Sequence, residues 1–144
     1  MDELRFVIAD DHEIVREGLR SLIEKQPGWK VVGEAGNGRE AVEKTKELNP
    51  DITVLDIQMP LLDGIEATRQ IRESGAKTKV LILTMHDSGA TIRRVIDAGA
   101  RGYIWKTDSA REFVAGVKAL RHDKMFLSEK ILGEFLNGRV GDGK

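Results

Sequence analysis

Short runs of apolar residues alternate along this chain with longer segments in which apolar residues recur every three or four positions. The short runs predict β-strands, at 4–9, 30–34, 52–55, 80–84 and 102–105. The longer segments predict helices, first one with an apolar face of Ile14, Leu19, Leu22 and Ile23, and then 38–48, 64–72, 90–98 and 110–120. Five strands that alternate with five helices favour right-handed βαβ units. The pattern therefore predicts an α/β fold with a doubly wound parallel sheet that helices cover on both faces.

Polar side chains stand where four of the five expected strands end. They are Asp10 and Asp11 after the first strand, Asp56 after the third, Thr84 at the end of the fourth and Lys106 after the fifth. The carboxyl ends of parallel strands meet at one edge of an open sheet, where such folds bind ligands. Two carboxylates about 4 Å apart repel by roughly 4 kcal/mol at an effective dielectric near 20. Three carboxylates therefore predict a Mg²⁺ site, with the lysine and the hydroxyl beside it holding an anion.

Composition removes several other classes of protein. The 144 residues carry 23 basic and 24 acidic side chains, a formal net charge of -1, which does not favour direct nucleic-acid binding. The chain has no cysteine, so it forms neither disulfides nor thiolate metal sites. Its apolar runs are far shorter than the ~20 residues of a membrane span. We expect a cytoplasmic protein with one main domain and no membrane contact.

Five motifs, in order, carry a resemblance to a known family: ADDHEIVREGL, VVGEAGNGREAV, PDITVLDIQMPLLDGIEA, VLILTMHD and AGARGYIWKTDSA. Together they resemble the receiver domain of two-component response regulators of the NarL/FixJ (LuxR-type) family, over roughly residues 4 to 122. The resemblance implies a CheY-like, flavodoxin-like (βα)5 sandwich with strand order 2-1-3-4-5. The chain departs from many receivers at Thr107, where those carry a proline after the lysine. It also departs at Met85, where many carry a small residue, and Met85 is expected to roof the phosphorylation pocket in part.

The resemblance also implies a role for each candidate residue. Asp56 is expected to accept a phosphoryl group from a sensor histidine kinase, with Mg²⁺ as cofactor, and beyond its own phosphorylation and slow dephosphorylation the chain is not expected to be an enzyme. The expected metal ligands are Asp10, Asp11, Asp56 and the backbone carbonyl of Gln58. Thr84 and Lys106 are expected to contact the phosphoryl oxygens, and Tyr103 to act as the aromatic switch. A phosphorylation-dependent homodimer through the fourth and fifth helices is a further expectation.

Simpler interpretations stand beside these roles. Asp11 could cap the first helix, Lys106 could be a solvated cation and Tyr103 a packing aromatic. We interpret His12, His86 and His122 as ordinary surface or cap residues, and His86 also as a candidate for tuning the lifetime of a phosphoryl group. A Rossmann nucleotide site is excluded because glycines, not acids, would follow the first strand. A dehalogenase-like phosphatase would need a second acid at Gln58. The remaining alternative is a receiver-like protein-interaction module that signals without phosphorylation.

The last part of the chain, 125–144, predicts a linker helix and a tail after a receiver domain at 1–124. Ser128 is a candidate N-cap, an apolar face contains Ile131, Leu132, Phe135 and Leu136, and Asn137-Gly138 is expected to end the helix. Regulators of the resembled family carry a C-terminal DNA-binding domain, for which we expect the residues after the fifth helix to be too few. We expect an excised or a stand-alone receiver that does not itself bind DNA specifically.

Overall fold

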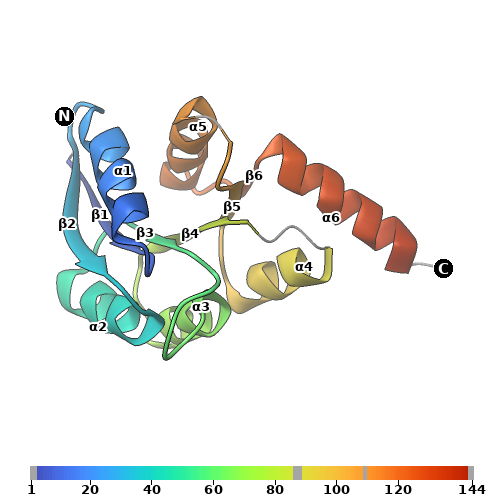
Figure 1. Cartoon of the computed structure of the whole chain (residues 1–144), viewed down its shortest axis with the longest axis horizontal. Coiled ribbons are helices and arrows are strands. Elements are labelled where there is room, and N and C mark those ends of the chain that lie inside the picture. The colour runs from blue at the N-terminus through green and yellow to red at the C-terminus, as the bar shows by residue number, and fades with distance from the viewer. Residues whose placement is uncertain (1–2, 86–88, 109, 143–144) are drawn as a thin grey trace.

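The computed structural model describes residues 3–85, 89–108 and 110–142, so His86, a candidate for tuning the lifetime of a phosphoryl group, lies outside it (Figure 1). Within these residues six parallel strands form one sheet in the order β2-β1-β3-β4-β5-β6. They are β1 (Leu4–Ala9), β2 (Trp29–Ala35), β3 (Ile52–Leu55), β4 (Lys79–Thr84), β5 (Gly102–Trp105) and β6 (Phe126–Leu127). The predicted α/β class and the order of the first five strands are confirmed.

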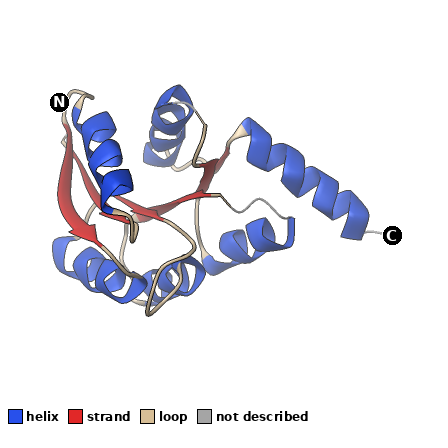
Figure 2. Cartoon of the chain, viewed as in Figure 1, coloured by secondary structure: helices blue, strands red, loops and turns tan. Residues whose placement is uncertain are grey.

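Helices cover both faces of this sheet, as predicted (Figures 1 and 2). The helices are α1 (Glu13–Glu24), α2 (Gly38–Leu48), α3 (Gly64–Glu73), α4 (Gly89–Ala98), α5 (Ala110–Arg121) and α6 (Glu129–Asp142). One core lies between the sheet and α1 and α5, and a second lies between the sheet and α2, α3 and α4. The strands β1, β3 and β4 are nearly continuous apolar runs, because they are buried on both faces of the sheet.

The first helix departs from its predicted apolar face. Leu19 and Ile23 are buried, but Ile14 is 82% exposed. At 3.6 residues per turn, Ile14 lies about 140° around the helix from Leu19 and about 180° from Ile23. The placement of Ile14 on the buried face was therefore wrong, because the helical angle puts it on the opposite side.

The end of the chain adds a strand that the pattern did not predict. Phe126–Leu127 forms β6 and pairs with β5, a segment too short to show a periodicity. The Ser128 amide continues this pairing by donating to the Tyr103 carbonyl at 3.1 Å. The Ser128 carbonyl accepts from the Leu132 amide at 2.8 Å, so Ser128 stands at the predicted N-cap position of α6. Its buried hydroxyl, however, has no partner among the described residues and makes no cap bond. The sheet pairing, rather than the hydroxyl, directs the chain into α6.

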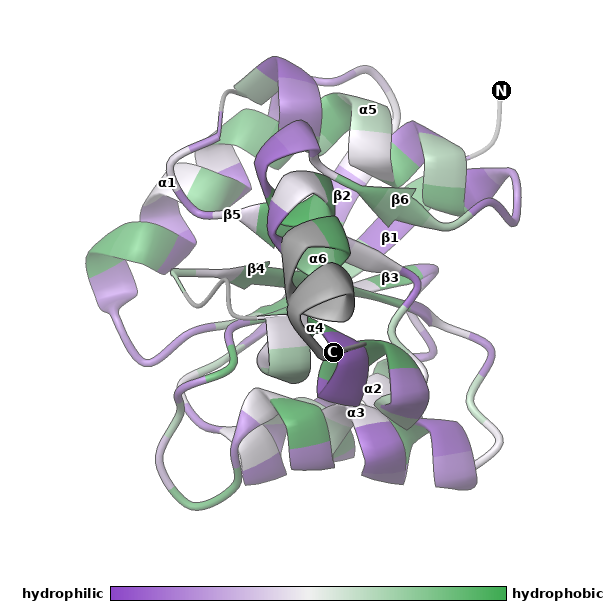
Figure 3. Cartoon of the chain, turned by 90° about the vertical axis from the view of Figure 1, so that its right-hand side faces the viewer, coloured by the Kyte–Doolittle hydropathy of each residue, from purple (hydrophilic) through white to green (hydrophobic). Residues whose placement is uncertain are grey.

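The helix α6 lies along α4 and β5 at the edge of the sheet (Figure 3). Ile131 is buried and Phe135 packs against the core, whereas Leu132 and Leu136 are 42% and 49% exposed. Only half of the predicted apolar face is therefore in contact with the domain. The helix also continues through Asn137 and Gly138 to Asp142. The predicted stop was wrong because a glycine costs only about 1 kcal/mol inside a helix and need not end it.

Candidate functional site

The strand-end residues meet at the carboxyl edge of the sheet, as the parallel fold requires. Asp10 follows β1, Asp56 follows β3, Thr84 ends β4 and Lys106 follows β5. The Lys106 amide donates to the Thr84 carbonyl at 2.8 Å, which extends the pairing of β4 and β5 by one residue and places the lysine at this edge. The peptide bond between Lys106 and Thr107 is trans. The fold thus assembles a site from four separate segments of the chain.

Lys106 connects two of the carboxylates. Its Nζ lies 2.9 Å from Asp10 Oδ2 and 3.1 Å from Asp56 Oδ2. The lysine side chain is only 16% exposed, so it is not the solvated surface cation of the simpler interpretation. Burial alone would lower the pKa of Lys106, but the hydrogen bonds and charges of Asp10 and Asp56 outweigh burial and raise it. The ammonium group therefore stays charged between the two acids.

Asp56 is held tightly and is 6% exposed. Its Oδ1 accepts a hydrogen bond from the Ile57 amide at 2.8 Å, and its own amide donates to the Ala9 carbonyl at 3.1 Å. Gly64 packs against the backbone of Asp56, where no larger residue fits, because a Cβ at Gly64 would lie 2.1 Å from the Asp56 carbonyl oxygen. Burial raises the pKa of Asp56; Lys106 opposes this increase and the Asp10 charge adds to it. The surroundings of Asp56 therefore disfavour the ionised form of its carboxyl group.

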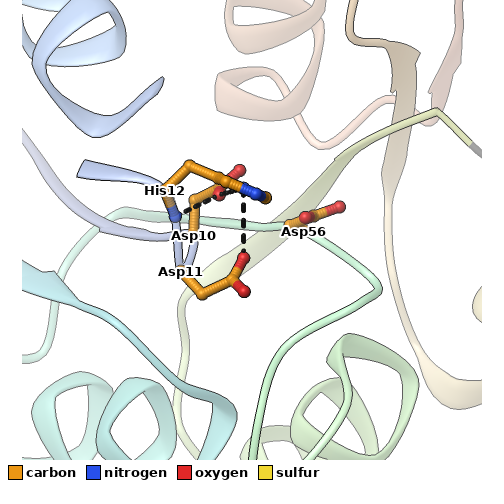
Figure 4. A group of neighbouring side chains, drawn as sticks. All are labelled: Asp10, Asp11, His12 and Asp56. Carbon is orange, nitrogen blue, oxygen red and sulfur yellow. Dashed lines mark hydrogen bonds and ion pairs between the residues drawn. The ribbon is translucent and has the colours of Figure 1, made fainter. Parts of the chain in front are cut away.

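Asp10, Asp11 and His12 form the rest of the site (Figure 4). Asp10 is 2% exposed, and its Oδ1 accepts from the His12 amide at 2.8 Å. The His12 Nδ1 lies 2.9 Å from Asp10 Oδ1 and 3.2 Å from Asp11 Oδ1. The residue at the N-cap of α1 is His12, and no side-chain cap bond is recorded for it within the described part of the chain. The alternative that Asp11 caps the helix was wrong, because its carboxylate faces the His12 ring within the site.

Sequence analysis missed two residues that support this turn. Arg16, one helical turn after His12, donates from Nη1 to the Asp10 carbonyl at 2.6 Å and from Nε to Glu34 Oε1 at 3.2 Å. Glu34 belongs to β2, so Arg16 links the loop after β1 to the neighbouring strand. Both residues stand in the quoted motifs, but no local pattern indicates that they pair across 18 positions.

The remaining candidates lie around this centre. Thr84 and Tyr103 are both fully buried. The expected strand order 2-1-3-4-5 places Tyr103 on an edge strand, but β6 pairs with β5 at that edge. The Tyr103 ring is completely buried, in a cluster that includes Ile131 of α6. Gln58 is exposed in the loop after β3, two residues beyond Asp56. Met85, expected to roof the pocket in part, is 52% exposed.

The donor set suits a divalent cation. Asp10, Asp11, His12 and Asp56 each offer one ligand atom, and these four atoms lie within 4.8 Å of one another. Three of the four are carboxylate oxygens, the ligands that Mg²⁺ prefers. A cation there would also reduce the repulsion among three acids that Lys106 balances only in part. The residues present therefore fit a bound Mg²⁺.

The fold and this acidic strand-end site together define a CheY-like α/β domain. Residues 6–118 match the family described as the response regulator receiver domain. The chain belongs to this family. It is a receiver domain of a two-component response regulator, a signalling protein, and receiver domains typically bind Mg²⁺ at their acidic pocket.

Relatives place it near the LuxR/NarL-type regulators. In Bacillus subtilis (strain 168), the transcriptional regulatory protein LnrK is 40% identical over 134 residues, which are 93% of this chain and 61% of LnrK. The transcriptional regulatory protein LiaR of the same strain is 38% identical over 134 residues, 93% of this chain and 64% of LiaR. The chain spans less than two thirds of the length of these curated relatives.

Solved structures of response regulators are similar to this chain in fold and in sequence. A two-component response regulator of the LuxR family from Aurantimonas sp. SI85-9A1 has a TM-score of 0.91 and 40% identity, over 96% of this chain and 99% of that one. The signal receiver domain of the putative response regulator NarL from Mycobacterium tuberculosis has a TM-score of 0.82 and 32% identity, over 85% of this chain and 98% of that one. Among the described residues, no helix has both the length and the apolar character to cross a membrane.

Proposed function

We propose that Asp56 accepts a phosphoryl group from a phosphohistidine of a sensor histidine kinase, and that this modification switches a transcriptional output. The observation that carries the proposal is the position of Lys106, whose Nζ contacts both Asp56 and Asp10 at the carboxyl edge. A nearly buried carboxylate with a raised pKa, a fixed cation and two further acids has the parts that phosphoryl transfer needs.

Phosphoryl transfer to Asp56 requires that the reacting groups be positioned and that the negative charge of the phosphoryl oxygens be neutralised. A carboxylate oxygen of Asp56 forms a bond to phosphorus as the bond from phosphorus to the histidine nitrogen breaks, and the nitrogen keeps the electron pair. Lys106 balances the negative charge that arrives with the phosphoryl oxygens, and the Thr84 hydroxyl is the second group proposed to contact them. Asp10, Asp11, Asp56 and the Gln58 backbone carbonyl would hold Mg²⁺, which supplies further neutralisation of charge when bound.

The sheet register supports a route from this event to the output. Thr84 pairs with Trp105, and Tyr103 lies two residues earlier on β5, so their side chains share one face of the sheet. The Tyr103 carbonyl accepts from Ser128, which leads directly into α6. A shift of Thr84 toward the phosphoryl group would change the packing of Tyr103 and, through it, of α4 and α6. This is a shift between two populations of one fold.

The partners follow from this route. The proposed input partner is the sensor histidine kinase. The proposed output is a homodimer that forms on phosphorylation through the α4 and α5 side, with 125–144 serving as the linker toward a DNA-binding domain. DNA recognition is assigned to that domain and not to the residues of this chain.

The test is incubation with Mg²⁺ and acetyl phosphate, followed by intact-mass spectrometry. We expect one added phosphoryl group on the wild-type chain and none on Asp56→Asn. Asp51→Asn is the matched control, because Asp51 precedes β3 at its other end and is exposed. Uptake by Asp56→Asn would assign the acceptor elsewhere, and no uptake by the wild type would favour an interaction module that signals without phosphorylation.

A further inference from the structure

His12 lies inside the acidic site and not on a neutral part of the surface. Its Nδ1, rather than its other ring nitrogen, faces both Asp10 Oδ1 and Asp11 Oδ1 (Figure 4). The backbone supports this position, because the His12 amide donates to the same Asp10 oxygen. The imidazole is 65% exposed, so it stands at the mouth of the site with room to adjust. This nitrogen forms a hydrogen bond with Asp10 Oδ1, and the roles proposed above for Mg²⁺ and the phosphoryl group do not involve it.

The spacing around Nδ1 matches that of ligand atoms around one ion. Two donors each about 2.1 Å from a metal and at right angles to each other are roughly 3.0 Å apart. The His12 nitrogen is 2.9 Å and 3.2 Å from the two carboxylate oxygens. With Asp56, these residues form a group of one nitrogen and three oxygen donors within 4.8 Å. Side-chain rotations that bring these four atoms closer together would place them on one cation.

The chemistry of the nitrogen determines which cation benefits. Mg²⁺ takes oxygen ligands and keeps several of its waters. Imidazole suits the later first-row transition ions, and the affinity of such mixed sites rises from Mn²⁺ through Co²⁺ and Ni²⁺. We propose that His12 is a nitrogen ligand through which this acidic site binds later first-row transition dications, such as Co²⁺ and Zn²⁺, in preference to Mg²⁺. This inference rests on the acidic metal site of the proposed function.

The experiment compares Co²⁺ and Mg²⁺, each titrated alone by calorimetry into the full chain. We expect His12→Asn to weaken Co²⁺ binding by about tenfold or more, a change at least as large as outer-shell substitutions cause. The Mg²⁺ dissociation constant should change by less than about threefold, since Mg²⁺ does not use the imidazole. A spectrum of the Co²⁺ complex should carry the signature of a bound imidazole in the wild type and lose it in His12→Asn.

Two controls locate the effect. His122→Asn makes the same chemical change at an exposed position after α5 and should leave both affinities unchanged. The double variant His86→Asn/His122→Asn keeps His12 as the last of the three histidines and should retain the Co²⁺ preference. Asp11→Asn should weaken both ions, because both use that carboxylate.

The outcomes separate this inference from the proposed function. An equal loss of Co²⁺ and Mg²⁺ binding in His12→Asn would mean that the histidine only shapes the turn, and tighter binding of both would mean that it competes with the metal. Either result overturns the inference while the Mg²⁺ site stands. If Asp11→Asn and Asp56→Asn change the affinity for neither ion, the acidic metal site itself is wrong.

Discussion

The strand β3 has an aspartate beyond each end, and the two acids have opposite surroundings. Asp51, at the amino edge of the sheet, is exposed and accepts a hydrogen bond from the Arg5 amide at 2.8 Å. Asp56, at the carboxyl edge, is 6% exposed and contacts Lys106. The amino edge also has its own pair of a lysine and an acid, Lys79 with Asp123. The two edges therefore use the same kinds of side chain.

The two pairs of a lysine and an acid, Lys79 with Asp123 and Lys106 with Asp56, differ in burial, and burial determines the direction in which the pKa of each acid shifts. Asp123 is fully exposed, and the hydrogen bond and charge of Lys79 lower its pKa. Around Asp56 burial outweighs the attraction of Lys106, and the pKa is raised. A hollow of about 590 Å³ lies at the amino edge, away from the acidic site, between loops that include Asn49, Asp51 and Lys77. A large hollow therefore does not identify the functional edge of the sheet. A buried carboxylate whose pKa is raised does, and Asp56 is such a group.

The largest expected difference between the edges comes from two glycines. Gly64→Ala places a Cβ 2.1 Å from the Asp56 carbonyl oxygen, so the backbone must move. We expect a loss of about 3 kcal/mol or more in the free energy of unfolding. Gly75→Ala, at the amino edge, meets no atom within 4 Å but has a φ of +81°. It should lose only about 1 kcal/mol. Urea denaturation measures both, and equal losses would contradict the crowding at Asp56.

Removing the buried lysine should have the next largest effect. Lys106→Met leaves Asp10 and Asp56 facing each other without a cation. We expect a loss of roughly 2–3 kcal/mol at pH 7 without metal, somewhat less than for a fully buried pair. Because the pKa of Lys106 is raised, titration of the lysine itself removes none of this contribution below its ordinary pKa of 10.5. The deficit should shrink at acidic pH, where Asp56 takes up a proton. A deficit that stays constant between pH 7 and pH 4 would argue against this pairing.

Asp56→Asn should increase stability by a smaller amount. Because the pKa of Asp56 is raised in the folded chain, ionisation of this group opposes folding above that pKa. The cost disappears as pH falls below the ordinary value of 3.8, since the carboxyl is then protonated in both states. Thermal melts without metal should therefore place Asp56→Asn above the wild type at pH 7, and the two should converge near pH 4. A variant that melts below the wild type at pH 7 would contradict the raised pKa.

The smallest expected effect is at the exposed pair. Lys79→Met removes the ion-pair partner of Asp123. The Asp123 carboxylate is exposed, so water solvates it with or without the lysine. We expect the midpoint of thermal unfolding to move by less than about 3 °C, as exposed ion pairs contribute little. The shift should become smaller still in high salt. If Lys79→Met and Lys106→Met are equally damaging, burial does not distinguish the two edges.

Much of the site follows from the sequence because local signals place the ends of the strands. The apolar run before Asp10 and the one before Asp56 both stop at an acid, and a parallel sheet brings all carboxyl ends to one edge. The sequence thus determined that Asp10, Asp56, Thr84 and Lys106 are neighbours. Caps were also predictable: the Asp63 side chain accepts from the Glu66 amide at the start of α3, where Asp63-Gly64 marks a helix start.

Other features depend on contacts between segments far apart in the chain. The pairing of Arg16 with Glu34 does not follow from spacing, because it forms only when α1 packs beside β2. Tyr103 is fully buried in a cluster that includes Ile92 of α4 and Ile131 of α6, which come from two separate parts of the chain. The sequence alone determined which side chains reach the carboxyl edge, because periodicity and breakers act over a few residues. Tertiary structure alone decided how deeply each is buried and which partner it faces, because desolvation and packing depend on atoms that come from the whole chain.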